Sequence, residues 1–299
     1  MSGDVNFSNV VLLLHGDGAN GSTTFTDRSP VPKTVTPFGN ANISSAQSRF
    51  GGSSIYFDGS GDYLRTASHS DFNFSSGDFT IELWVFAIIL ASQPYIVQFY
   101  GGVTSQRFAI QILSSGVPSL YVESGGSGGS YASSVGISAG TYSHIALCKS
   151  GATTRLFVGG VLGYTGTPSQ AYPNVSCLVE FGAAVAASVA YLNGYLNDIR
   201  ITKGVARYTS AFTPPDRPHP DGFGEVEGVI RDSAGAPASR TVRLMRRDTG
   251  AVVSSTISDP VTGAYRLATP TLGEVVRIVH SNTTTAPLEN DLIDRVIPA

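Results

Sequence analysis

With 299 residues, of which 41% are hydrophobic, the chain is long enough to bury one large core and one small one. Charged residues make up only 14% and the net charge is −3, which argues against nucleic acid or an anionic membrane surface as a partner. The longest apolar runs, residues 10–14 and 85–91, are shorter than the roughly 20 residues that span a bilayer. The N-terminus lacks the basic start and cleavage site of a signal peptide. We therefore expect a soluble protein without membrane insertion.

Alternating apolar and polar residues predict β-strands along most of the first 213 residues. In residues 79–86, Phe79, Ile81, Leu83 and Val85 share one fully apolar face, which is strand periodicity. The Gly159-Gly160 pair predicts a tight hairpin, because two consecutive glycines can take the positive φ of a primed turn. The Ala-rich stretch 182–189 is compatible with a short helical turn. Further strands are predicted at 55–57, 108–113, 120–123, 142–149, 155–158, 161–164, 178–181 and 191–201.

A Pro-rich segment divides the chain after residue 213. Residues 214–222 hold four prolines, which cannot donate to a sheet and which stiffen a connector, so we expect a linker there. Residues 223–299 are predicted to form a small antiparallel β-sandwich, because their strands are short and regularly spaced. These strands are expected at 224–231, 240–247, 252–257, 264–268, 275–280 and 292–297. The expected fold class is all-β, with one domain at 1–213 and a second at 223–299.

Five segments of the first domain carry a family resemblance, and they follow the family's order. They are residues 54–64 (SIYFDGSGDYL), 78–85 (DFTIELWV), 142–146 (YSHIA), 156–160 (LFVGG) and 191–201 (YLNGYLNDIRI). Together they resemble the concanavalin A-like lectin/glucanase superfamily, specifically its laminin G-like and pentraxin-like members. The resemblance implies a jelly-roll β-sandwich over residues 1–213.

Other segments resemble bacteriophage proteins. Residues 200–208 (RITKGVARY) and 212–215 (FTPP) look like the version of this domain in phage virion and tail proteins, and 290–298 looks like the ends of phage structural proteins. Residues 228–265 are similar to carboxypeptidase-regulatory-like and transthyretin-like (Ig-like) sandwiches. These resemblances imply a tail-associated virion protein, assembled in the host cytoplasm with other virion proteins and with copies of itself. It would display a lectin-like domain to host-surface glycans; the alternative is a free carbohydrate-binding module or adhesin.

No pattern in the sequence indicates an enzyme. Glycosidases of this superfamily need two carboxylates about 5 to 5.5 Å apart, which on one strand means two acids on the same face. Glu82 has no such neighbour, and Glu123 and Glu180 stand alone. Residues 125–129 match the Gly-x-Ser-x-Gly elbow, but without its strand and helix we expect a flexible loop.

Metal ligands are not evident either. Asp58 and Asp62 have the early spacing of a calcium loop, but the later positions lack its Gly and Glu, so an EF-hand is rejected and a hairpin turn is expected. Calcium at the rim of the sandwich stays open, with Asp17, Asp58, Asp62 and Asp198 as candidate ligands, and no other cofactor is expected. The five histidines have no zinc-binding spacing, and His144 is interpreted as a core residue. Packed thiols are expected at Cys148 and Cys177, with a disulfide as the alternative.

Aromatic residues in loops are the feature best suited to sugar binding, because the C–H face of a sugar packs on a ring while amides and carboxylates bind its hydroxyls. Five tyrosines lie at or near predicted loop tips, with one asparagine close by. The alternative is that these tyrosines cover a low-charge surface or a subunit interface. The candidate glycan-binding residues are Tyr95, Tyr100, Tyr131, Tyr164, Tyr172 and Asn174.

Overall fold

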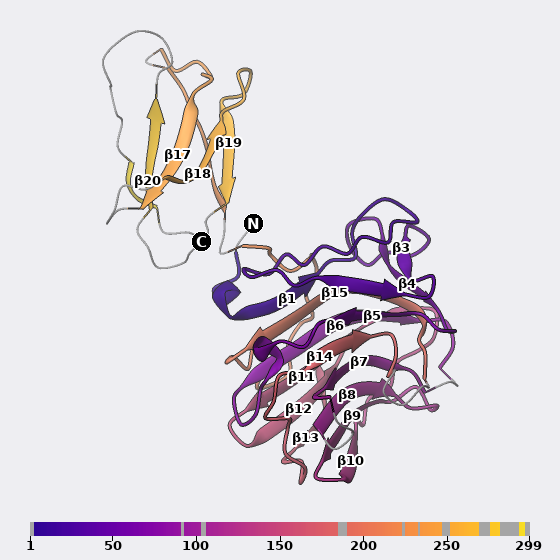
Figure 1. The fold of residues 1–299 in the computed structure, drawn as a ribbon. Helices are drawn as coiled ribbons and strands as arrows, with labels where there is room; N and C mark the ends of the chain where they lie inside the picture. Colours follow the sequence, from indigo (N-terminus) through magenta and orange to yellow (C-terminus); the bar gives the residue numbers. More distant parts are fainter. Residues whose placement is uncertain are drawn as a thin grey trace. The chain divides into compact units, whose positions relative to one another are not determined.

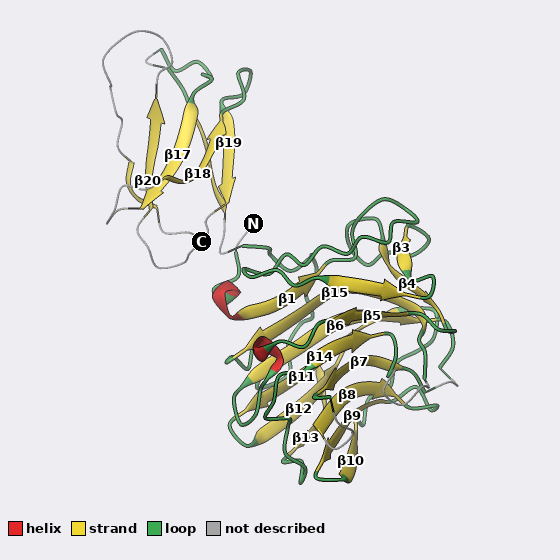
Figure 2. Cartoon of the chain, in the orientation of Figure 1, coloured by secondary structure: helices red, strands yellow, loops and turns green. Residues whose placement is uncertain are grey.

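The chain folds into two compact units, Asn9–His219 and Met1–Ser8 with Pro220–Ala299, in a computed structural model. Residues 214–219 of the Pro-rich segment belong to the larger unit. The structure describes residues 3–90, 93–102, 106–184, 190–222, 225–232, 234–246, 252–268, 276–281 and 293–296. In these residues the helical elements are two 3-10 turns, η1 (Phe7–Asn9) and η2 (Ser70–Phe72), and strands predominate (Figure 2). No helix among them is long and apolar enough to cross a membrane.

Two antiparallel sheets form the larger unit as a sandwich (Figure 1), which confirms the expected all-β fold. The first sheet has the order β13-β12-β11-β6-β15-β4-β3, and β1 pairs with β15. Its strands are β1 (Val10–Leu14), β3 (Asn42–Ser44), β4 (Ser54–Asp58), β6 (Phe79–Ala87), β11 (Tyr142–Ser150), β12 (Thr153–Val158), β13 (Val161–Gly166) and β15 (Asn193–Lys203).

The second sheet has the order β10-β9-β8-β7-β14-β5-β2. Its strands are β2 (Val35–Phe38), β5 (Tyr63–Thr66), β7 (Tyr95–Tyr100), β8 (Gln106–Ile112), β9 (Pro118–Ser124), β10 (Ser127–Ala132) and β14 (Leu178–Phe181). One large apolar core lies between the two sheets. Phe79, Ile81, Leu83 and Val85 are all fully buried in it, as the alternation in residues 79–86 predicted.

The hairpin between β12 and β13 is confirmed, with φ of 58° at Gly159 and 78° at Gly160. The expectation of a flexible loop at residues 125–129 is wrong for most of that segment. Residues 127–132 form β10, which pairs in continuous register with β9. The ladder needs only main-chain groups, so a Gly/Ser sequence can join it despite its low strand propensity. Residues 182–184 are not helical, and 185–189 lie outside the described residues.

Two small antiparallel sheets make up most of what is described of the smaller unit. One pairs β16 (Glu225–Val229) with β19 (Ala264–Ala268). The other has the order β18-β17-β20-β21, formed by β17 (Thr241–Arg246), β18 (Val252–Ile257), β20 (Val276–Ser281) and β21 (Ile293–Val296). Each strand expected after residue 223 thus has a counterpart in the structure.

Candidate functional site

A groove of about 570 Å³ opens in the larger unit where three segments meet. These segments are residues 75–76 before β6, the β11–β12 hairpin, and residues 167–174 after β13. Hydroxyl and amide groups line it, which are the groups that exchange hydrogen bonds with polar uncharged ligands. Its polar lining includes Ser75, Ser76, Thr154, Thr167, Gln170 and Asn174.

Lys149 joins two walls of this groove. Its Nζ donates to the main-chain oxygens of Ser76 at 2.5 Å and Gly77 at 3.2 Å. Gly151 N donates to Oδ1 of Asp78 at 2.8 Å, which ties the hairpin to the same loop. Burial lowers the pKa of Lys149, and Asp78 opposes this shift. The single charged side chain on the groove lining is therefore engaged with the protein itself.

Tyr172 forms the floor of the groove and extends into the core. Its ring packs edge-on against Phe79 and Phe108, with centroid distances of 5.1 and 5.0 Å. Its hydroxyl lies 3.0 Å from Oγ1 of Thr154, and burial raises its pKa well above the usual range. Only 6% of Tyr172 is exposed, so it supports the groove and offers no open ring face to a sugar.

Tyr131 and Tyr164 lie beside the groove, with ring centroids 5.5 Å apart. The Tyr131 hydroxyl donates to Oε1 of Gln170 at 2.5 Å and accepts from the main-chain N–H of Ser169 at 2.9 Å. It thereby fixes residues 169–170, which form part of the groove wall. Asn174 is exposed on the lining. Four of the six predicted glycan-binding residues therefore gather around one segment.

The other two predicted residues lie elsewhere. Tyr95 and Tyr100 are the first and last residues of β7, in the second sheet. Tyr100 pairs with Arg107 on one side and Leu178 on the other. Neither tyrosine lines the groove. Both lie where β7 meets its flanking loops, away from the groove.

Two carboxylates lie on the outer face of the second sheet. Glu123 on β9 and Glu180 on β14 are separated by two intervening strands, a span of about 14 Å at the usual strand spacing. Glycosidases require carboxylates about 5 to 9.5 Å apart. Glu180 accepts from Arg65 and from Gln98, and Glu123 accepts from Arg107 at 2.7 Å. This pair does not have the geometry of a glycoside-hydrolysing centre.

The candidate calcium ligands are engaged with other groups. Asp17 pairs with Arg28 at 2.8 Å. Asp58, Asp62 and Asp198 accept hydrogen bonds from main-chain N–H groups. Asp58 ends β4 in the first sheet, and β5, which begins after Asp62, belongs to the second sheet. The expected hairpin turn is therefore wrong: the turn at residues 58–62 carries the chain from one sheet to the other. The four aspartates form no group of three metal donors in the described part of the chain, and their arrangement does not fit a calcium site.

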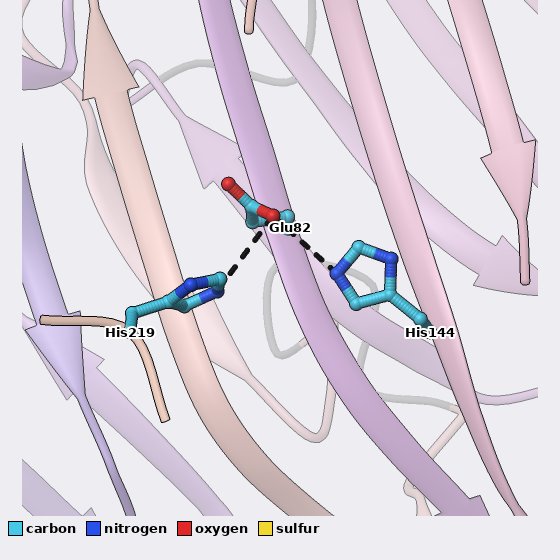
Figure 3. A group of neighbouring side chains, drawn as sticks. All are labelled: Glu82, His144 and His219. Atoms are coloured by element: carbon cyan, nitrogen blue, oxygen red, sulfur yellow. Dashed lines mark ion pairs between the residues drawn. The ribbon is translucent and has the colours of Figure 1, made fainter. Parts of the chain in front are cut away.

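A second polar cluster lies on the outer face of the first sheet, and four of its five members are buried while Tyr208 is partly buried. Arg200 on β15 donates from Nε and Nη2 to Oε1 of Glu82 on β6, at 3.0 and 2.7 Å. The Tyr208 hydroxyl donates to the other carboxylate oxygen, Oε2, at 2.8 Å. Nε2 of His144 lies 3.4 Å from Oε2, and Nε2 of His219 lies 3.6 Å from it (Figure 3). We call these five residues the Glu82 cluster.

Charge keeps Glu82 ionised in this buried setting. Burial by itself would raise its pKa, but Arg200, together with His219 and His144, outweighs that effect and holds the pKa well below its usual range. Asp198 adds a second carboxylate beside the cluster. It sits in a β-bulge of β15 with φ of 54°, accepts from the His219 main chain at 2.9 Å and lies 2.7 Å from Nδ1 of His15. The bulge turns its side chain toward His219.

No sequence pattern indicated the Glu82 cluster. His144 was expected to be a core or second-layer histidine with its polar atoms satisfied. It is fully buried, but it lies on the outer face of the first sheet and its ring nitrogens form no hydrogen bond. Its partners are 62 and 75 residues away along the chain, which follows from the positions of Glu82 and His219. The sequence held only a weak indication of this cluster. Glu82 is a charged residue on the face of the 79–86 strand opposite the core, and residues 200–212, much later in the chain, contain two arginines and two aromatic residues.

The two-sheet sandwich, with its core between antiparallel sheets, defines an all-β protein of the lectin-like class. Residues 58–207 match the family described as the concanavalin A-like lectin/glucanases superfamily (Laminin_G_3). The chain belongs to this family. No curated protein matches the chain.

Several solved structures share the fold at low identity. Domain 4 of AbnA, a GH43 extracellular arabinanase from Geobacillus stearothermophilus in complex with arabinotriose, is 16% identical, with a TM-score of 0.51 over 66% of this chain and 94% of that one. The binding domain of Paraclostridial Mosquitocidal Protein 1 is 14% identical, with a TM-score of 0.51 over 92% and 76%. The binding domain of botulinum neurotoxin serotype D is 11% identical, with a TM-score of 0.54 over 94% and 74%.

Proposed function

We propose that the larger unit is a carbohydrate-binding module and that a neutral glycan binds in the groove between the β11–β12 hairpin and residues 167–174. The single observation that carries this function is an open groove lined by exposed Asn174 together with Gln170 and further hydroxyl groups, with the Tyr131 hydroxyl holding Gln170 in place. Open clefts that combine apolar surface with uncharged polar groups suit sugars, whose hydroxyls both donate and accept. Family membership supports the same function, as does the arabinotriose complex of the similar arabinanase domain.

The groove favours a neutral ligand over an acidic one. Lys149 is the one charged residue on its lining, and its ammonium already donates to two main-chain oxygens. An anionic sugar would have to break those contacts to gain an ion pair. Exposed Asn174 and the fixed Gln170 wall instead provide neutral polar groups for sugar hydroxyls.

A glycan array followed by isothermal titration with arabinotriose and with the best array ligand tests this function. We expect Asn174→Ala and Gln170→Ala to weaken binding at least about tenfold each, equivalent to about 1.4 kcal/mol. Tyr100→Ala, at the end of β7 and off the groove lining, serves as the control and should bind like the unmodified protein. Absence of any glycan ligand, with or without calcium, would overturn the proposal. An equal loss of glycan affinity in Tyr100→Ala would indicate that the glycan binds on the second sheet and not in this groove.

A second candidate function is display of this module on a virion, in a homo-oligomer. Its support is the resemblance of residues 200–208, 212–215 and 290–298 to phage tail and structural proteins. The resemblance of residues 228–265 to transthyretin-like sandwiches adds to it. Mass spectrometry and immunogold labelling of purified particles test it. A chain that is absent from particles and strictly monomeric by light scattering would contradict it.

A further inference from the structure

Three metal-ligating side chains converge inside the Glu82 cluster, from three separate elements. Glu82 comes from β6, His144 from β11 and His219 from the segment that follows β15. Their ligand atoms all lie within 4.8 Å of one another, and both imidazole rings approach the same carboxylate oxygen (Figure 3). They are the one such group of three among the described residues of the chain.

The histidine nitrogens in this cluster lack hydrogen-bond partners. Nδ1 and Nε2 of His144 and Nε2 of His219 are buried, and none of the three forms a hydrogen bond. The side chains of His144 and His219 are 0% and 2% exposed. A buried polar atom left unsatisfied costs about 1–3 kcal/mol, and such atoms are rare in folded proteins. Both Nε2 atoms lie in ion-pair contact with one carboxylate oxygen, an arrangement from which all three atoms could ligate one cation.

We propose that Oε2 of Glu82, Nε2 of His144 and Nε2 of His219 form a structural binding site for Zn²⁺. A tetrahedral zinc ion with bonds of about 2.0–2.1 Å holds its ligand atoms about 3.3 Å apart. The two distances to Oε2, 3.4 and 3.6 Å, are already close to that value. Two imidazoles and one carboxylate suit zinc, whereas calcium and magnesium prefer oxygen ligands.

Two carboxylates and one guanidinium surround the histidines. Arg200 binds Oε1 of Glu82 and leaves Oε2 to face the histidines. Asp198 contributes a second negative charge, with Oδ2 at 3.7 Å from Nε2 of His219. The Tyr208 hydroxyl donates a hydrogen bond to Oε2, so a bound metal would share that oxygen with Tyr208. Zinc would fasten the end of the residue 205–219 segment to the first sheet, independently of any glycan in the groove.

Because the ligands are buried, metal uptake has to accompany folding. The test is to unfold the full chain with EDTA and refold it with and without one equivalent of ZnCl₂. Metal content after gel filtration is then measured by elemental analysis, and the thermal midpoint by calorimetry. We expect one zinc per chain and a midpoint raised by about 5 °C or more. His144→Gln and His219→Gln should abolish zinc retention, whereas the control His69→Gln, at the partly exposed N-cap of η2, should retain it.

Co²⁺ gives a second readout that does not depend on variant stability. Refolding with CoCl₂ should produce the visible absorption of tetrahedral cobalt with nitrogen and oxygen ligands, and Tyr208→Phe should preserve or strengthen it because Oε2 loses a competing donor. Less than about a tenth of an equivalent of zinc, with no cobalt absorption, would overturn the proposal and leave the cluster a buried ion pair. Zinc retained by both histidine variants would overturn it as well.

Discussion

Arg200 and Glu82 pair directly across β15 and β6, and the guanidinium donates two hydrogen bonds to a single carboxylate oxygen. Both side chains are buried, at 7% and 0% exposure. Truncating one partner of a buried ion pair leaves the other charge uncompensated, which is costly. We expect Arg200→Ala to lower the free energy of unfolding by about 3–5 kcal/mol in urea titrations.

Lys203, at the exposed end of the same strand, gives the matched control. Its Nζ donates only to the main-chain oxygen of Ser70 at the surface, so Lys203→Ala should cost less than about 0.5 kcal/mol. The double substitution Glu82→Leu with Arg200→Leu should recover part of the loss of Arg200→Ala, because neither charge of the pair is then left without its partner. Equal effects of Arg200→Ala and Lys203→Ala would contradict this account.

The two glycines of the β12–β13 hairpin should respond differently to alanine. Both have positive φ, so each substitution strains the main chain by about 1 kcal/mol. A Cβ at Gly159 meets open space, whereas a Cβ at Gly160 would overlap the main-chain oxygen of Phe212. We therefore expect Gly160→Ala to destabilise the protein by at least about 2 kcal/mol more than Gly159→Ala. Chemical denaturation of the two variants measures this difference, and similar midpoints would count against the packing of Phe212 on the hairpin.

The buried carboxylate of Asp27 holds the loop that follows β1 through several main-chain hydrogen bonds. Its carboxylate accepts from the main-chain N–H groups of Leu13, Ser29 and Lys33, at 2.9, 2.9 and 2.7 Å. Asp27→Ala leaves these donors without their acceptor and should cost about 3 kcal/mol or more. Asp17→Ala, which removes an exposed ion pair from the same region, should cost less than about 1 kcal/mol. Thermal unfolding of both variants checks the ranking, and the reverse order would refute it.

Stability should fall at alkaline pH because of the two buried thiols. Cys148 and Cys177 are free and buried, as the sequence predicted, and burial raises their pKa values from 9.0 to about 12 and about 11. Above pH 9 the unfolded chain therefore releases thiol protons that the folded chain retains, which favours unfolding. Stability from this source is fully present below about pH 9 and is lost as the pH rises toward 12.

Cys148→Ala with Cys177→Ala is the control for this prediction, and its stability should decline less steeply over the same pH range. In native protein at pH 8, Ellman's reagent should label neither thiol, whereas in denaturant it should label both. Rapid labelling of the native protein would show that the thiols are accessible.

The sequence located the groove only in part. Four of the six candidates lie around the segment of residues 164–174. Three of them, Tyr164, Tyr172 and Asn174, belong to that segment, and the fourth, Tyr131, is joined to it by a hydrogen bond to Gln170 and by its ring contact with Tyr164. Tyr95 and Tyr100 fell outside it, because both are ends of β7, which lies three strands away from β10 in the second sheet. Nothing in the alternation of its strand distinguished Lys149 as a groove residue. Its ammonium contacts the main-chain oxygen of Ser76, which lies 73 residues earlier in the chain, so the contact could not be predicted from nearby residues.

Alternation along each strand determined the all-β fold, the inward face of β6 and the Gly159-Gly160 turn, because a period of two and a positive φ are properties of neighbouring residues. Only the tertiary structure decided what covers the opposite face of β6. Segment 205–219 folds back over that face and buries Glu82 with Arg200, His144 and His219. The alternation along a strand shows which side chains share a face. Which element covers that face depends on packing between residues far apart in the sequence, and the local alternation carries no information about it.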